Sequence, residues 1–317
     1  MGGCDIAREE RHAYLDLAGD GRVDEAVHLC LDLYDRGVAP EAIALRLLRP
    51  AQCEVGRRWS LGTGTVAQEH AVSAAADAAL AALSAAAPAR TRGDPVVVAC
   101  PRTEWHGLAA RMVTQLLRWR GVAAEFVGTL ASDAALAQLV DDRRPRALAL
   151  SCTMTSALPE VARAVVVAGR HETAVVGGGQ GFGPQGRYAR SVGVVEWVAD
   201  APELARRAAR WDRTAWPAGA HPVPESVGYR RLVRRRHELA RAVAARLIHD
   251  ELGADDVELV RDAAEQVVAV ALAAARTGHG SILADGVAEL SASLGRRPSP
   301  VSAVAARLPG VVHAELG

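Results

Sequence analysis

Several common features are missing from this chain of 317 residues, and each absence argues against a class of function. Charge of neither sign is in surplus, because 37 basic residues balance 37 acidic ones. A DNA-binding arm or an anchor for an anionic membrane normally leaves a basic excess. No apolar run is long enough to span a bilayer, and the first ten residues lack the apolar core of a signal peptide. We therefore expect a cytoplasmic protein that binds neither membranes nor nucleic acid directly.

Cysteines and aromatic residues are also scarce. The five cysteines are scattered without any CxxC spacing, which favours reduced thiols in ordinary packing over disulfides or a zinc site. Aromatic residues make up only 4% of the chain, and six of them are tryptophans. Each tryptophan is therefore worth locating.

The hydrophobic pattern divides the chain into three regions. Residues 1–92 contain four periodic segments with short glycine-containing connections, which is typical of a four-helix bundle, and Pro50 is expected to kink or break the third segment. Residues 93–215 alternate short apolar strands with helices, and residues 216–317 are helical again after a proline-rich linker. The predicted strands are 96–100, 123–127, 147–152, 173–176 and 194–198. We expect an α/β plus all-α protein, with a parallel five-stranded sheet between two helical regions.

Polar or glycine-rich segments follow three of these strands, at the edge where such sheets bind ligands. They contain Glu104 and His106 after the first strand, Ser151 and Thr153 at the third, and residues 177–183 after the fourth. An imidazole here can ligate a metal, while the nearby carboxylate supports the loop or the second ring nitrogen. Each segment alone has a plainer interpretation, because a lone loop histidine is more often structural. The glycines lack the order of a phosphate-binding P-loop but would admit a bulky group close to the backbone.

Together, Glu104-Trp105-His106, Ser151-x-Thr153 and Gly177-Gly178 resemble the histidine loop, serine loop and double glycine of cobalamin-binding domains. The resemblance implies a flavodoxin- or Rossmann-like domain that binds the corrinoid with its nucleotide base withdrawn. It also implies that His106 is the lower axial ligand of cobalt and that Glu104 tunes it. The implied binding residues of this domain are Glu104, Trp105, His106, Gly107, Ser151, Thr153, Gly177, Gly178 and Gly179. Two positions depart from the family pattern, since Glu104 replaces the usual aspartate and Ala109 replaces the usual glycine.

A second motif lies in the helical region before the sheet. Trp59 is followed after nine residues by Glu69 and His70, which resembles the Trp-x9-Glu-His signature of CarH-like, adenosylcobalamin-dependent photoreceptors. In that family the bundle caps the upper face of the corrin, and these residues surround the adenosyl group. The plainer alternative is a core tryptophan and a solvated Glu-His pair. Ser60 stands where several relatives have a histidine that captures cobalt after photolysis, which leaves open whether His70 takes that role.

The last region begins with an arginine cluster. Domain order and helical content resemble the photocobilins, in which a globin-like helical domain binds the linear tetrapyrrole biliverdin near the cobalamin. The resemblance implies noncovalent biliverdin, and the expected contacts are Arg230, Arg231, Arg234 and Arg235 to the propionates and His237 to a pyrrole. The alternative is that the arginines form a solvated helix face.

The sequence therefore predicts a non-catalytic light sensor that binds adenosylcobalamin, and biliverdin as a second chromophore. Breakage of the cobalt–carbon bond by light would change its conformation or oligomeric state. A homodimer and a downstream protein partner are expected. Two alternatives stay open: a corrinoid methyl carrier of a methyltransferase system, and a cobalamin-responsive antirepressor that acts by binding a protein.

Overall fold

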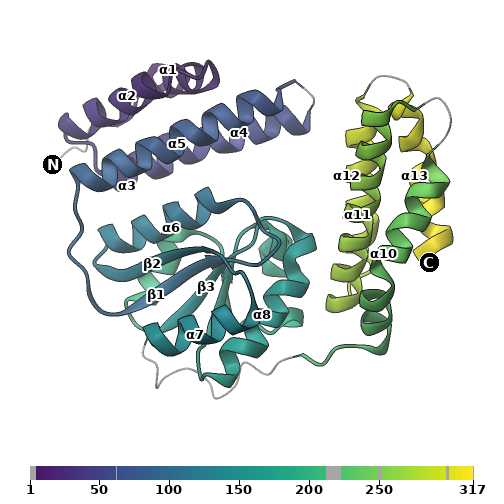
Figure 1. Cartoon of the computed structure of the whole chain (residues 1–317). Coiled ribbons are helices and arrows are strands. Elements are labelled where there is room, and N and C mark those ends of the chain that lie inside the picture. Colours follow the sequence, from purple (N-terminus) through teal and green to yellow (C-terminus); the bar gives the residue numbers. More distant parts are fainter. Residues whose placement is uncertain (1–4, 62, 212–222, 249–251, 298–299, 317) are drawn as a thin grey trace. The chain divides into compact units, whose positions relative to one another are not determined.

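The computed structural model describes residues 5–61, 63–211, 223–248, 252–297 and 300–316. Contacts divide the chain into two units. The first comprises residues 1–93 and 108–124, and the second comprises residues 94–107 and 125–317. Figure 1 labels those helices and strands for which there is room.

The first unit is a helical bundle with a core of aliphatic side chains and alanines. Its elements are α1 (Arg8–Gly19), α2 (Val23–Asp35), α3 (Pro40–Ile43), the π-helical η1 (Ala44–Leu48), α4 (Arg49–Ser60) and α5 (Val66–Ala86). Six residues of the alanine-rich α5 are buried, which lets its neighbours approach closely. Thr65 caps α5: its hydroxyl accepts the backbone N–H of Gln68, whose side chain accepts the N–H of Thr65 in return.

The expected kink or break at Pro50 takes the form of a π-helical turn. The chain stays helical from α3 through α4, and η1 ends directly before Arg49, whose N–H reaches the carbonyl of Ala44. Proline has no N–H to bond the carbonyl four residues earlier, so an ordinary α-turn would be incomplete here. A wide turn just before Pro50 is a known way for a helix to absorb such a defect.

Helix α6 (Gly107–Trp119) belongs by its contacts to the first unit. Met112 lies in the bundle core, with 7% of its surface exposed. Arg111 pairs with Asp77 of α5 at 2.5 Å, and the Trp119 indole N–H donates to the carbonyl of Ala87 at 3.0 Å. The bundle core thus includes a helix that sequence order alone assigns to the next region.

A five-stranded sheet carries the α/β region. Its strands are β1 (Arg92–Cys100), β2 (Val122–Thr129), β3 (Ala147–Ser151), β4 (Val175–Gly178) and β5 (Glu196–Val198). The order is β2-β1-β3-β4-β5, and β1, β3, β4 and β5 pair in parallel. This order is that of flavodoxin-like folds, which bind ligands where β1 and β3 diverge. The prediction of a five-stranded sheet in a Rossmann-like domain is confirmed.

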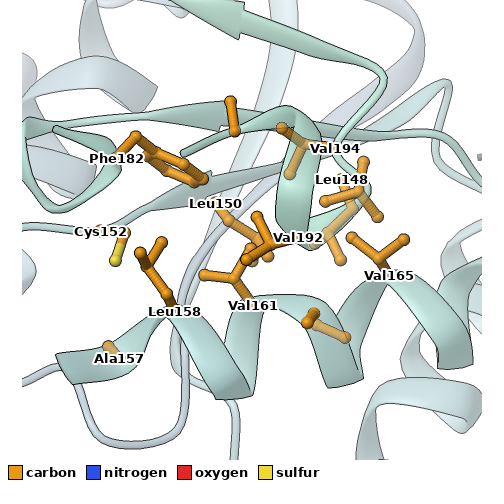
Figure 2. Close-up of a cluster of buried hydrophobic side chains, with 14 of the residues drawn as sticks. Leu148, Leu150, Cys152, Ala157, Leu158, Val161, Val165, Phe182, Val192 and Val194 are labelled. Carbon is orange, nitrogen blue, oxygen red and sulfur yellow. The ribbon is translucent and has the colours of Figure 1, made fainter. Parts of the chain in front are cut away.

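Two helices, α7 (Asp133–Arg143) and α8 (Leu158–Arg170), share one buried core with this sheet. Figure 2 shows Leu148 and Leu150 of β3 facing Val161 and Val165 of α8, with the Phe182 ring beside them. A short α9 (Ala201–Ala208) follows β5. The core therefore fixes the carboxyl ends of the strands, where the candidate residues lie.

The C-terminal part consists of α10 (Val227–Leu247), α11 (Ala254–Thr277), α12 (Ser281–Gly295) and α13 (Val301–Leu316). The prediction of helices here is confirmed, while the globin-like fold stays a prediction. These helices have a core of their own, yet Ala273, Ala274 and Ile282 belong to the buried core of the sheet domain. Among the described residues, none of the helices combines the length and apolarity needed to cross a membrane.

Candidate functional site

Glu104 and His106 form a close pair on the loop between β1 and α6. Nδ1 of His106 lies 2.5 Å from Oε1 of Glu104, which also accepts the backbone N–H of His106 at 3.0 Å. The Glu104 side chain is fully buried, whereas 56% of the His106 side chain is exposed. A carboxylate at Nδ1 fixes the ring orientation and makes Nε2 the nitrogen suited to a metal. The pair therefore fits a cobalt-ligating histidine.

The second oxygen of Glu104 binds the loop that follows β3. Oε2 accepts the backbone N–H groups of Thr153 at 2.6 Å and of Met154 at 2.8 Å. The Thr129 hydroxyl donates to the Glu104 carbonyl at 3.0 Å. The sequence suggested that this carboxylate supports either the loop or the ring. It does both, and it also joins two loops that lie about fifty residues apart in sequence.

Two competing effects set the pKa of Glu104 and therefore the charge of the Glu104–His106 pair. Burial raises the pKa of Glu104, but hydrogen bonds from the His106 ring and from three backbone N–H groups outweigh it and leave the pKa below its usual value. Burial, with a smaller effect of the Glu104 charge, raises the pKa of the Cys100 thiol to about 11. The same causes raise the pKa of Cys152. Glu104 is therefore ionised near neutral pH, while both neighbouring thiols stay protonated.

Ser151 and Thr153 lie at the end of β3, on either side of the buried Cys152. Ser151 is half-buried and pairs in register with Gly178 of β4. Thr153 takes part in the site through its backbone N–H, as does Met154. The sequence indicates Thr153 as a polar residue of this loop but gives no indication of Met154, because backbone donors leave no signal in residue type.

The three glycines at the end of β4 differ in how much space their surroundings leave for a side chain. A Cβ on Gly177 would lie 2.5 Å from the Phe182 ring. Gly179 has a φ of +104°, and a Cβ there would lie 2.3 Å from the carbonyl oxygen of Cys152. At Gly178 the nearest atom, the Val198 carbonyl oxygen, is 3.5 Å away. Packing within the chain thus explains Gly177 and Gly179, which is a different reason from the ligand cradle that the sequence suggested.

Trp105 and Gly107 complete the loop. The residue Trp105 is 84% exposed, and its carbonyl accepts the N–H of Gly107 at 2.9 Å. Gly107 starts α6, and a Cβ there would only touch the Phe126 ring at 3.6 Å. An exposed indole beside a candidate metal ligand offers an apolar surface to a large planar ligand.

The second motif lies in the first unit. Trp59 is in the last turn of α4, and its side chain lies outside the described residues. Glu69 and His70 are in the first turns of α5, so the α4–α5 connection brings the backbone of all three to one end of the hairpin. His70 is 73% exposed with Nε2 3.5 Å from Oε2 of Glu69, and the Ser73 hydroxyl donates to Oε1 of Glu69 at 3.0 Å.

The arginine cluster lies on the exposed surface of α10. Exposed positions of this cluster include Arg230, Arg231, Arg234, Arg235 and His237. Arg235 forms an ion pair with Glu238 at 2.8 Å, and Arg230 donates to the carbonyl of Glu225 at 2.8 Å. These contacts agree with the solvated-face interpretation.

The donor set fits a corrin better than a bare metal ion. Among the described residues, no group of three or more His, Cys, Asp or Glu side chains is placed to hold a metal ion. A corrin would bring its own ligands to cobalt, so that a single histidine of the protein would be enough. His106 would supply that ligand, Glu104 would orient it, and the exposed Trp105 would contact the macrocycle.

Comparison with known proteins points in the same direction. Residues 95–209 match the B12 binding domain family, and residues 10–84 match a second B12 binding domain family. A stretch of 105 residues, 33% of this chain, is 38% identical to the HTH-type transcriptional repressor CarH of Myxococcus xanthus. The chain spans only 35% of the length of that repressor.

The fold is shared with a corrinoid protein. The structure of the monomethylamine corrinoid protein of Methanosarcina barkeri matches with a TM-score of 0.55 at 16% identity, over 64% of this chain and 98% of that one. A likeness at this identity concerns the fold alone. The two B12 binding domain matches support cobalamin binding, and over one third of its length the chain is similar to the CarH repressor.

Proposed function

We propose that the chain is a non-catalytic light sensor that binds adenosylcobalamin, with His106 as the lower axial ligand of cobalt. The observation that carries the ligand assignment is a buried Glu104 held against Nδ1 of an exposed His106. Adenosylcobalamin, when bound, supplies a cobalt–carbon bond that light can break. Glu104 fixes the orientation of the His106 ring and keeps the proton on Nδ1. The backbone N–H groups of Thr153 and Met154, which donate to Glu104, hold its carboxylate in place in turn.

The light-sensing part of the proposal rests on the motif of Trp59, Glu69 and His70. These residues would surround the upper ligand, as the resemblance to CarH-like photoreceptors implies. Because Ser60 replaces the histidine of several relatives, His70 would be the candidate ligand after photolysis. Signalling would then follow from a change of conformation or of assembly, with a homodimer as the basic unit.

The test is a dark titration of the purified full chain with adenosylcobalamin, followed by illumination. His171 provides a matched control for His106, because its Nδ1 also faces a carboxylate oxygen, that of Asp141, at 2.7 Å. We expect His106→Ala to weaken binding about tenfold or more and to lose the spectrum of a nitrogen-ligated cobalt, while His171→Ala behaves as the unmodified chain. Equal behaviour of the two variants would refute the ligand assignment.

Illumination tests the switching part separately. We expect the spectrum of the bound adenosyl form to convert to that of the hydroxo form, together with a change in light-scattering mass or in hydrogen exchange. A spectral conversion that leaves both measurements unchanged would remove the signalling function and leave a cobalamin-binding protein.

Noncovalent biliverdin binding by the C-terminal helices is the second part of the proposal. It is supported by domain order and helical content. Exposed arginines of α10 would meet the propionates, and His237 would contact a pyrrole; the arginines are Arg230, Arg231, Arg234 and Arg235. Incubation with adenosylcobalamin and biliverdin, separately and together, followed by gel filtration, tests it. Retention of cobalamin alone would remove this part.

A corrinoid methyl carrier is the main alternative. That function predicts methylcobalamin, a reduced cobalt cycle and a methyltransferase partner. The Trp-x9-Glu-His motif speaks for the sensor instead. A cobalamin-responsive antirepressor would respond to cobalamin through a protein partner and take up no bilin. Preference for methylcobalamin over adenosylcobalamin in the dark titration would favour the carrier.

A further inference from the structure

The loop after β3 lies between the histidine pair and the C-terminal helices. Its first contact is with Glu104, whose Oε2 accepts the N–H groups of Thr153 and Met154 while Oε1 holds the His106 ring. These hydrogen bonds are short and the carboxylate is fully buried. The Glu104 side chain therefore links the His106 ring directly to this loop.

The next contact is within the loop itself. The carbonyl of Met154 accepts the N–H of Ala157 at 3.0 Å, and this bond closes the 3-10 turn η2 (Thr155–Ala157). The Cys152 thiol donates to the same carbonyl at 3.2 Å. Met154 is thus bonded to Glu104 on its N–H side and to η2 on its carbonyl side. Consecutive hydrogen bonds thus connect Glu104 with η2.

Helix α11 packs against η2. Ala157 and Leu158 are fully buried in the same core cluster as Ala273 and Ala274 of α11 and Ile282 of α12. Figure 2 shows Ala157, Leu158 and Cys152 together at one end of this cluster. Close-packed interfaces of this kind shift as a whole, because little empty space exists to absorb a movement.

The end of α11 that meets the sheet domain contains an unsatisfied group. Arg276 is 6% exposed; its Nη2 donates to the Val223 carbonyl at 2.9 Å, and its guanidinium lies 5.8 Å from the centre of the Tyr229 ring. Within the described residues its Nη1 is buried without a hydrogen-bond partner. A buried donor left unpaired disfavours the arrangement that contains it.

From these contacts we propose that the C-terminal helices sense whether His106 is bound to cobalt, through Glu104, Met154 and η2. The proposal rests on the proposed function, since it takes His106 as the cobalt ligand. Binding at Nε2 holds the ring, Glu104 and the loop in one position, and α11 adopts the arrangement that fits it. Coupling between two sites is reciprocal. The factor by which bound cobalamin shifts the equilibrium of α11 is therefore also the factor by which a shift of α11 alters the affinity for cobalamin.

Hydrogen exchange of the full chain tests the coupling without any substitution. Exchange is followed by mass spectrometry in the dark, with and without saturating adenosylcobalamin. We expect slower exchange in peptides from η2 and from the second half of α11, and no change in peptides from α13. In His106→Ala at saturating cobalamin, the protection of α11 should be lost. Protection confined to the loops after β1 and β3 would overturn the inference.

A matched pair of variants tests the reverse direction. Ala273 and Ala264 are both fully buried on α11, but Ala273 belongs to the core shared with η2 and Ala264 to the core of the C-terminal helices. We expect Ala273→Leu to weaken adenosylcobalamin binding about 5- to 150-fold, and Ala264→Leu to leave it within about twofold. Equal affinities of the two variants would overturn the inference.

Failure of the proposed function gives a different result. If the unmodified chain does not bind adenosylcobalamin, or binds it independently of His106, the ligand assignment fails. If binding depends on His106 but α11 neither gains protection nor changes the affinity when Ala273 is enlarged, only the coupling fails. If Ala273→Leu does not fold, the exchange experiment on the unmodified chain decides.

Discussion

Glu104 accepts four hydrogen bonds with one buried carboxylate, and a glutamine cannot replace it. The amide of Glu104→Gln turns an NH2 group toward donors, so that at least one buried N–H of His106, Thr153 or Met154 loses its acceptor. An unsatisfied buried donor costs about 1–3 kcal/mol. We expect the free energy of unfolding in urea to fall by about 2 kcal/mol and cobalamin binding to weaken about 10- to 100-fold.

Glu125 is the control for this change. Its side chain is 34% exposed and pairs with Arg143 at the surface, so that Glu125→Gln should change stability by less than about 1 kcal/mol. Equal effects of the two glutamines would mean that Glu104 does not organise the site.

Two adjacent glycines give a second test at single residues. Gly179→Ala forces a side chain into a left-handed conformation and against the Cys152 carbonyl, whereas Gly178→Ala meets only ordinary van der Waals contact. We expect Gly179→Ala to lower the free energy of unfolding by about 2 kcal/mol or more, and Gly178→Ala to change it by less than about 1 kcal/mol. Urea denaturation followed by circular dichroism measures both. A Gly178→Ala variant as unstable as Gly179→Ala would contradict the packing explanation.

The sequence could predict part of this site. Glu104 and His106 are separated by one residue on a strand-to-helix loop, so that their proximity follows from local geometry. The contacts of Glu104 with the N–H groups of Thr153 and Met154 could not be predicted, because they depend on backbone positions in a distant loop. The sequence also could not show why position 179 needs glycine, because the reason is the nearby carbonyl of Cys152.

At the scale of elements, the start of α5 positions the Glu69-His70 pair. The Thr65 hydroxyl caps this helix, and Glu69 and His70 follow in its first turns. Loss of an N-cap costs about 1 kcal/mol and lets the first turn fray. We therefore expect Thr65→Ala to lower the melting temperature and to speed exchange of the amides around Glu69. Thr63→Ala removes a hydroxyl that only donates to the Arg58 carbonyl and should have a smaller effect. The opposite order would show that the cap does not hold this end.

The sequence predicts the presence of the strands and helices better than the residues at which they begin and end. Runs of apolar residues identified all five strands, because a parallel sheet covered by helices needs them. The strand β1 nevertheless begins at Arg92, several exposed residues before the apolar run, so that hydrophobicity alone does not mark its start. The turn η1 was also beyond prediction, because proline signals a defect in a helix but not its form.

At the scale of the molecule, the partners of each helix could not be read from the sequence. Periodicity shows that a helix has an apolar face but not what covers it. Thus α6 follows β1 in sequence yet contributes Met112 to the bundle core, and α11 divides its buried face between two cores. Ala273 and Ala274 look like any other alanines of a helical hairpin, although they pack in the core of the sheet domain.

Because that core is shared, the sheet domain and the C-terminal helices should lose stability together. Ile282 of α12 is 3% exposed within the shared core, and Leu308 of α13 is fully buried in the core of the C-terminal helices alone. Truncation of either to alanine leaves a cavity worth about 2–5 kcal/mol. In Ile282→Ala we expect faster hydrogen exchange in peptides of α8 as well as of α12. In Leu308→Ala, faster exchange should be confined to the C-terminal helices. If α8 keeps its protection in both variants, the two parts open independently, and α11 has no mechanical hold on the loop beside His106.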